Sequence, residues 1–103
     1  MSEFQKGVEA SKVPSGSMVT VDVGGEQVLI CNVDGKYYGM GAICNHQQWD
    51  LSEGILEGTA VTCAGHGTVW DIKTGKGVFD EPLDDEPLFD VKEEDGFLFV
   101  KRR

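Results

Sequence analysis

Residues 18–40 read MVTVDVGGEQVLICNVDGKYYGM and contain three segments rich in β-branched, aliphatic and aromatic residues. The dipeptides Gly24-Gly25 and Asp34-Gly35 separate these segments. Both dipeptides accept the positive φ angles that two-residue hairpin turns require. The stretch therefore predicts three antiparallel strands joined by tight turns.

Similar segments continue along the chain, and no part of it shows a sustained helical repeat. They begin at Thr59, Thr68, Leu88 and Phe97, with turn signals at Gly58, Gly75 and Asp95-Gly96. We expect an all-β fold, an antiparallel β-sandwich or small barrel of about eight to ten strands, with residues 1–103 forming a single domain. Residues 43–54, 63–67 and 79–87 lack a strand pattern, so these loops are the candidates for function.

The bulk composition is that of a globular protein, with 40% apolar and 26% charged residues. No apolar segment approaches the roughly 20 residues that a membrane span needs, and the N-terminus does not resemble a signal peptide. The net charge of -9 argues against nucleic acid or an anionic membrane as a partner and favours a basic protein. We expect a soluble, cytoplasmic monomer.

Acidic residues are concentrated toward the C-terminus, where half of the eighteen lie between Asp80 and Asp95. Such a segment is most simply a solvated edge. The chain has three cysteines, an odd number, and no export signal, so a disulfide framework is not expected. Cys31 lies in an apolar segment and is interpreted as a small core residue without a redox role.

Two cysteine and histidine pairs carry the chemistry. Cys44-x-His46 is followed by sixteen intervening residues and then by Cys63-x-x-His66, and these are the only two histidines. A mononuclear zinc ion could take all four side chains. A two-iron cluster, with both thiolates on one iron and both imidazoles on the other, also explains why each loop mixes the two ligand types. A thiol hydrolase would leave one pair unused.

The flanking sequence resembles the Rieske [2Fe-2S] domain family, and in particular the soluble Rieske-type ferredoxins that serve oxygenase systems. The resemblance covers most of the chain: ASKVPSGS at residues 10–17, LSEGILEG at 51–58, GHGTVWDIKTGKG at 65–77 and EPLDDEPLFDVKEEDGFLFV at 81–100. It implies a [2Fe-2S] cluster as the cofactor. Cys44 and Cys63 would hold the inner iron, and His46 and His66 the outer iron. Pro82 matches the family's proline loop, which covers the cluster.

The sequence departs from the respiratory members of the family at four positions. Trp49 and Gly65 stand where those proteins have two cysteines that form a disulfide, so that bridge cannot form. Thr68 replaces a serine whose hydroxyl bonds a bridging sulfide and could do the same, whereas Trp70 replaces a tyrosine. Trp49 either caps the cluster or serves as an exposed docking residue.

The resemblance implies an electron-transfer protein that transforms no substrate itself. It would take one electron from a reductase and pass it to a terminal redox enzyme, an oxygenase being the expected one. The docking interface should be small, below about 1,200 Å² in total. The alternatives are the small Rieske subunit of a nitrite-reductase-like enzyme and a mononuclear Cys2His2 zinc module.

Overall fold

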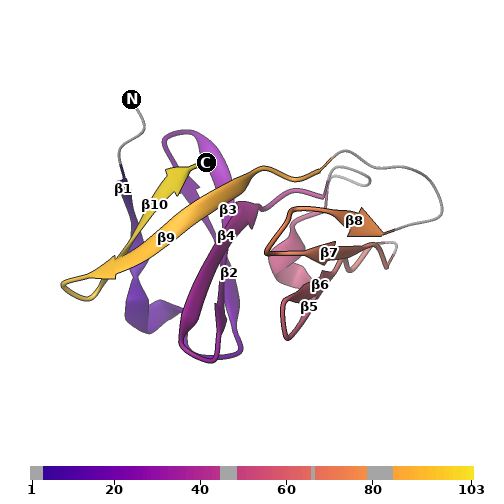
Figure 1. Ribbon diagram of the computed structural model, residues 1–103, viewed down its shortest axis with the longest axis horizontal. Coiled ribbons are helices and arrows are strands. Elements are labelled where there is room, and N and C mark those ends of the chain that lie inside the picture. The colour runs from indigo at the N-terminus through magenta and orange to yellow at the C-terminus, as the bar shows by residue number, and fades with distance from the viewer. Residues whose placement is uncertain (1–3, 45–48, 66, 79–84) are drawn as a thin grey trace.

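The computed structural model describes residues 4–44, 49–65, 67–78 and 85–103. These residues form two antiparallel sheets that lie side by side (Figure 1). The larger sheet has the strand order β1-β10-β9-β4-β3-β2, and the smaller has the order β5-β6-β7-β8. The all-β architecture predicted from the sequence is confirmed.

The six strands of the larger sheet curl into a nearly closed barrel, because β1 and β2 at its two ends approach each other. The strands are β1 (Gln5–Glu9), β2 (Met18–Val23), β3 (Glu26–Val33), β4 (Lys36–Gly41), β9 (Leu88–Glu94) and β10 (Phe97–Arg102). The smaller sheet contains β5 (Ile55–Glu57), β6 (Ala60–Thr62), β7 (Val69–Asp71) and β8 (Gly77–Val78). Two short 3-10 turns, η1 (Ala10–Lys12) and η2 (Leu51–Glu53), complete the described elements.

The predicted hairpin turns are present. Asp34 and Gly35 between β3 and β4 have φ angles of 53° and 87°, and Asp95 and Gly96 between β9 and β10 have 54° and 83°. Two successive positive φ angles define the type I′ turn, whose twist matches that of the flanking strands. The turns therefore set the register of the barrel hairpins, which pair without a bulge.

Strand β3 is buried on both faces, which explains its continuous apolar sequence. Val28 and Ile30 point into the barrel with residues such as Leu98, while Leu29 and Cys31 belong to a second apolar core. This second core extends from β3 and β4 to the small sheet. The small sheet is thus attached to the barrel through one face of two central strands.

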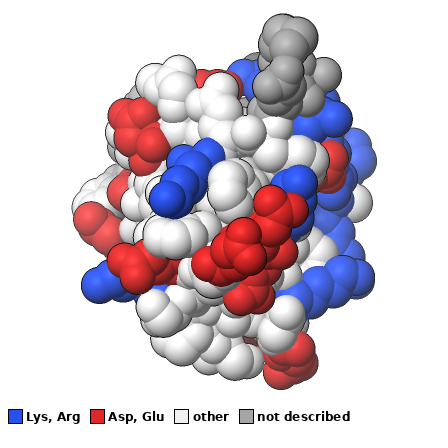
Figure 2. Space-filling model, turned by 90° about the vertical axis from the view of Figure 1, so that its left-hand side faces the viewer, with Lys and Arg blue, Asp and Glu red and all other residues white. Residues whose placement is uncertain are grey.

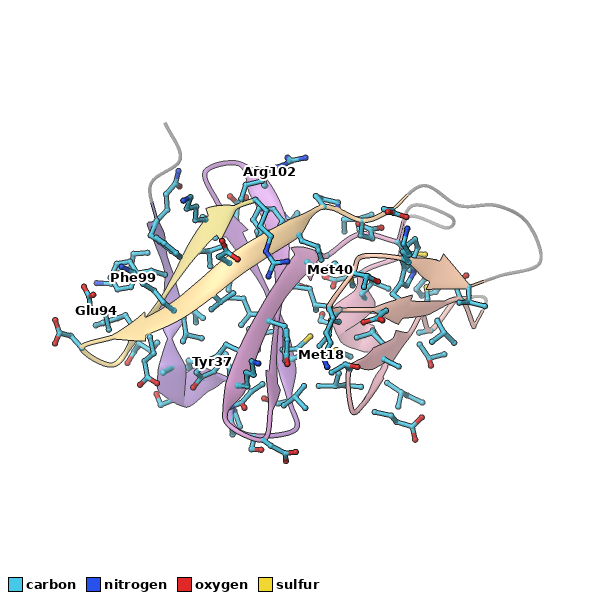
Figure 3. All side chains as sticks on the ribbon, viewed as in Figure 1. Met18, Tyr37, Met40, Glu94, Phe99 and Arg102 are labelled. Carbon is cyan, nitrogen blue, oxygen red and sulfur yellow. The ribbon has the colours of Figure 1, made fainter. Side chains whose placement is uncertain are left out.

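Met18 and Met40 lie at this junction, between the barrel and the small sheet (Figure 3). Met40 is fully buried, and Met18 packs against the same core. Unbranched methionine side chains fill irregular gaps well, so they suit the boundary between two packed sheets. The junction places the small sheet at the end of the molecule opposite the β9-β10 turn (Figure 1).

Three short strands were not anticipated. The strands β1, β5 and β8 have five, three and two residues, and none carries the β-rich pattern seen elsewhere. Their pairing is decided by neighbouring strands rather than by their own propensity. Among the described residues, no helix has the length and apolar character needed to cross a membrane.

Candidate metal centre

Two loops of equal length begin at cysteines and close in the same way. The backbone N–H of Cys44 donates to the carbonyl of Trp49 over 2.8 Å, and the N–H of Cys63 donates to the carbonyl of Thr68, also over 2.8 Å. We call residues 44–49 the first cysteine loop and residues 63–68 the second. Each cysteine is thereby fixed against the last residue of its own loop.

The residues just outside each loop also pair. Ile43 forms an isolated antiparallel bridge with Asp50, and Thr62 pairs with Val69 in the ladder between β6 and β7. Both loops therefore span six residues between paired flanks. Each cysteine is therefore the first residue of a loop that is closed in the same way.

The two cysteines lie in one apolar core. Cys44 is fully buried and Cys63 is 2% exposed, and both belong to the core that contains Leu51, Val61 and Trp70. Burial excludes water from the sulfur atoms, and a buried thiolate needs a cation to compensate its charge. The pair of sulfurs therefore fits a metal centre at the junction of the two sheets.

Cys31 belongs to the same core but differs chemically. Burial raises the pKa of its thiol to about 12, so the sulfur stays protonated at neutral pH. Its backbone lies in the middle of β3, paired with Met18 and Tyr38, and not at the start of a loop. This placement agrees with the interpretation of Cys31 as a core residue.

Two buried donors beside the cysteines lack a partner within the described part of the chain: Thr68 Oγ1 and Trp70 Nε1. Both residues are fully buried. An unsatisfied buried donor costs about 1 to 3 kcal/mol, so a native protein rarely keeps one without a reason. The sulfides and thiolates of an iron-sulfur cluster are hydrogen-bond acceptors, and the residues present therefore fit the group that the sequence resemblance implies.

Trp49 joins the two cysteine loops. A Cβ placed on Gly65 would lie 2.4 Å from Trp49 Nε1, so the indole packs directly against this glycine. Trp49 is 44% exposed, which means that one side of the ring faces Gly65 while another stays open to solvent. The loops are therefore held together by a ring packed on a glycine, at the two positions where the respiratory proteins have the disulfide.

Sequence reasoning missed the role of Asp50. One of its carboxylate oxygens accepts hydrogen bonds from the backbone N–H of Ser52 at 2.9 Å, from Ser52 Oγ at 2.8 Å and from Thr20 Oγ1 at 2.6 Å. Partial burial raises the pKa of Asp50, but these hydrogen bonds outweigh it and hold the pKa below its usual range. The Asp50-x-Ser52 spacing is a local capping signal that the sequence shows. The hydrogen bond from Thr20 has no such signal, because Thr20 is thirty residues away.

Three predicted residues lie outside the described ones: His46, His66 and Pro82. The structure thus brings together Cys44 and Cys63 of the four predicted ligands. The roles of the two histidines and of the proline loop stay predictions.

Comparison with known proteins identifies the family. A family model for the Rieske [2Fe-2S] domain matches residues 3–92. The chain is 36% identical over 86 residues to the biphenyl dioxygenase ferredoxin subunit of Pseudomonas sp. (strain KKS102), covering 82% of this chain and 77% of that protein. It is 39% identical over 61 residues to the ferredoxin component of biphenyl 2,3-dioxygenase of Rhodococcus jostii (strain RHA1), covering 59% of this chain and 57% of that protein.

A solved structure shares the fold. One chain of the complex of reduced oxygenase and oxidized ferredoxin in carbazole 1,9a-dioxygenase superposes with a TM-score of 0.84. The superposition covers 95% of this chain and 92% of that one, at 26% sequence identity. The arrangement of a barrel with a small sheet is therefore common to both proteins.

Proposed function

This chain belongs to the Rieske [2Fe-2S] domain family, and we propose that it is a one-electron carrier that takes an electron from a reductase and delivers it to a terminal oxygenase. The observation that carries the proposal is the pair of equal loops that bury Cys44 and Cys63 in one core. The protein is an electron-transfer component and not itself an enzyme.

We propose Cys44, His46, Cys63 and His66 as the ligands of the [2Fe-2S] cluster, the two cysteines on the inner iron and the two histidines on the outer. The burial of both cysteines supports the inner position for the thiolates. Neutral imidazoles in place of two thiolates make a cluster less negative and raise its reduction potential, to about -150 to +300 mV in Rieske centres. When bound, the cluster supplies a single reversible electron.

The surrounding residues keep that group dry and oriented. The apolar core excludes water from the cysteines, while Thr68 and Trp70 offer an O–H and an N–H that no described residue accepts. Hydrogen bonds to sulfur stabilise the added electron and so raise the potential. We assign the tuning of the potential to these two donors.

The partners follow from the relatives. Two of them are ferredoxin components of biphenyl dioxygenases, and a solved relative pairs a ferredoxin with an oxygenase. We propose an oxygenase as the electron acceptor and a reductase as the donor. Encounters of this kind are brief, so the interface is expected to stay below about 1,200 Å². The cytoplasmic location and the monomeric state remain predictions.

Metal analysis of the purified protein tests the proposal. We expect a coloured protein with two irons and two acid-labile sulfides per chain, which a reducing agent turns into a paramagnetic one-electron form. Stoichiometric zinc without iron, in protein made under iron-replete conditions, would instead support the mononuclear alternative.

The three buried cysteines provide a matched control for the ligand assignment. Cys44→Ala and Cys63→Ala should each abolish the visible spectrum of the cluster, whereas Cys31→Ala removes an equally buried thiol from the same core and should leave it unchanged. Loss of the spectrum in all three variants would mean that packing, and not ligation, explains the effect. Retention in Cys44→Ala or Cys63→Ala would reject that ligand.

A further inference from the structure

The outer face of the small sheet carries a row of exposed apolar residues. Cross-strand pairing aligns Ile55 with Thr62, Thr62 with Val69, and Val69 with Val78. Because paired residues in adjacent strands point to the same face, these four side chains form one line across all four strands. Ile55 is 62% exposed, Val69 36% and Val78 71%. We call Ile55, Thr62, Val69 and Val78 the outer row.

The opposite face of the small sheet packs against the apolar core, and the outer row takes no part in this packing. Leu56, Val61 and Trp70 form the parallel inner line, and they are half-buried or buried. The Trp70 ring extends over Gly77, where a Cβ would lie 2.7 Å from the ring. The outer row therefore makes no contribution to the packed interior that would explain its apolar side chains.

The outer row lies next to the cysteine loops. Thr62 immediately precedes Cys63, and Val69 immediately follows Thr68, at the two ends of the second loop. The next line on the same outer face, away from the loops, is Glu57, Ala60 and Asp71. The large exposed aliphatic side chains of this face thus lie at the level that borders the loops, whereas the level behind it carries two carboxylates and one alanine.

Charge is also distributed unevenly. Residues 43–88, which contain both loops and the small sheet, have nine Asp and Glu and two Lys. One of these lysines, Lys76, already lies 3.4 Å from Asp85. The rest of the chain has nine acidic and seven basic residues, and the barrel end shows both signs side by side (Figure 2). The acidic excess therefore gathers in the half of the chain that carries the outer row.

We propose that the outer row is a docking surface for a redox partner whose contact face is apolar at its centre and bordered by Lys and Arg. The inference rests on the proposed function, because the row extends the surface of the loops through which an electron would leave. An apolar strip gives short-range affinity, while the acidic surroundings select a partner with a basic border and accelerate the encounter. Three exposed aliphatic side chains form a small contact, as a transient complex requires.

A triple variant tests the docking surface. Ile55→Thr, Val69→Thr and Val78→Thr together keep β-branched side chains on the strands but make the row polar. Ala60→Thr is the matched control, since it adds the same threonine to the same face one line further from the loops. The visible spectrum, the midpoint potential and the Tm of each variant are measured first to establish that the cluster is intact.

Two partners serve as probes. One is the oxygenase component of the biphenyl dioxygenase of Pseudomonas sp. (strain KKS102), whose KM for the reduced protein is measured. The other is a gold electrode coated with a mixture of methyl-terminated and ammonium-terminated thiols, compared with a coating of ammonium groups alone. We expect the triple variant to raise KM about tenfold and to lose the faster electron exchange that the methyl groups give the wild type. Ala60→Thr should behave as the wild type in both assays.

The possible outcomes separate the two proposals. A wild-type chain without a reducible cluster overturns both the proposed function and the docking surface. A cluster-containing triple variant with wild-type KM and electrode rates overturns the docking surface alone. If that oxygenase accepts no electrons from the wild type, the comparison of electrode rates alone tests the docking surface. A triple variant that keeps the wild-type rate on the mixed coating then overturns it. Sedimentation that finds a wild-type dimer, dissociated in the triple variant, would assign the row to a second copy of the chain and contradict the proposal.

Discussion

Thr20 Oγ1 donates a 2.6 Å hydrogen bond to Asp50 Oδ1 and thereby links the barrel to the residue that follows the first cysteine loop. Thr20 lies in β2, whereas Asp50 pairs with Ile43 on the other side of that loop. The same Asp50 oxygen accepts the two hydrogen bonds from Ser52 that start the η2 turn. One carboxylate thus positions the loop of Cys44 relative to the barrel.

Removing the hydroxyl of Thr20 should loosen this link. We expect Thr20→Val, which keeps the shape of the side chain, to lower the free energy of unfolding by about 1 to 3 kcal/mol, because the lost hydrogen bond ends on a carboxylate. Denaturant unfolding of the cluster-containing protein measures this. Thr59→Val is the control, since the Thr59 hydroxyl makes no hydrogen bond with any described residue. An equal loss in both variants would show that Asp50 needs no donor from the barrel.

The pH dependence of stability should report the charge of Asp50. Its pKa in the folded protein lies below the ordinary value of 3.8, so its charged form adds stability above that value, and the contribution disappears as the pH falls through the lowered pKa. We expect the Tm difference between wild type and Asp50→Asn to stay constant from about pH 7 to 5 and to narrow below about pH 4.

The Tm difference between wild type and Asp71→Asn, measured over the same pH range, controls for acid damage to the cluster. Asp71 also accepts a backbone hydrogen bond, from the Lys73 N–H, but it lies on the exposed face of the small sheet. A difference for Asp50→Asn that widened toward low pH would have the wrong sign and would contradict the assignment.

A methyl group on Gly65 should separate the two cysteine loops. The added Cβ would lie 2.4 Å from Trp49 Nε1, and Gly65 does not have the positive φ that would add backbone strain. We expect Gly65→Ala to speed the loss of cluster absorbance in a chelator by severalfold, because the indole must move away. The control is the same change in a Trp49→Ala background, where the methyl group has room. Additive effects of the two changes would mean that the ring and the glycine do not support each other.

The hydroxyl of Thr68 should tune the reduction potential. We expect Thr68→Val to lower the potential by tens of millivolts while the cluster is retained, because a buried donor toward sulfur stabilises the added electron. Thr68→Ser restores the hydroxyl and should return the potential most of the way to that of the wild type. Voltammetry at a single pH measures all three proteins. An unchanged potential in Thr68→Val would show that this hydroxyl does not point toward the cluster.

Local sequence was enough to predict the barrel hairpins and the family. Asp34-Gly35 and Asp95-Gly96 are turns that only a few residue pairs can form, so they mark the strand ends without knowledge of the rest of the chain. The spacing of Cys44, His46, Cys63 and His66 likewise carried the resemblance to the Rieske family, whose model matches residues 3–92. The turn dipeptides and the two Cys/His motifs are each made of residues that are close in sequence. For that reason both can be recognised without a structure.

The three-dimensional structure decided the relationships between distant residues. Strands of two or three residues, such as β5 and β8, form because β6 and β7 offer them hydrogen bonds, and their own sequences do not favour a strand. The contacts of Thr20 with Asp50 and of Trp49 with Gly65, and the alignment of Ile55, Val69 and Val78 into one row, depend on register and packing across the fold. The sequence by itself determined which chemistry the chain carries, whereas the tertiary structure decided which residues position that chemistry and which surface borders it, because side chains far apart in the chain meet only when the sheets pack.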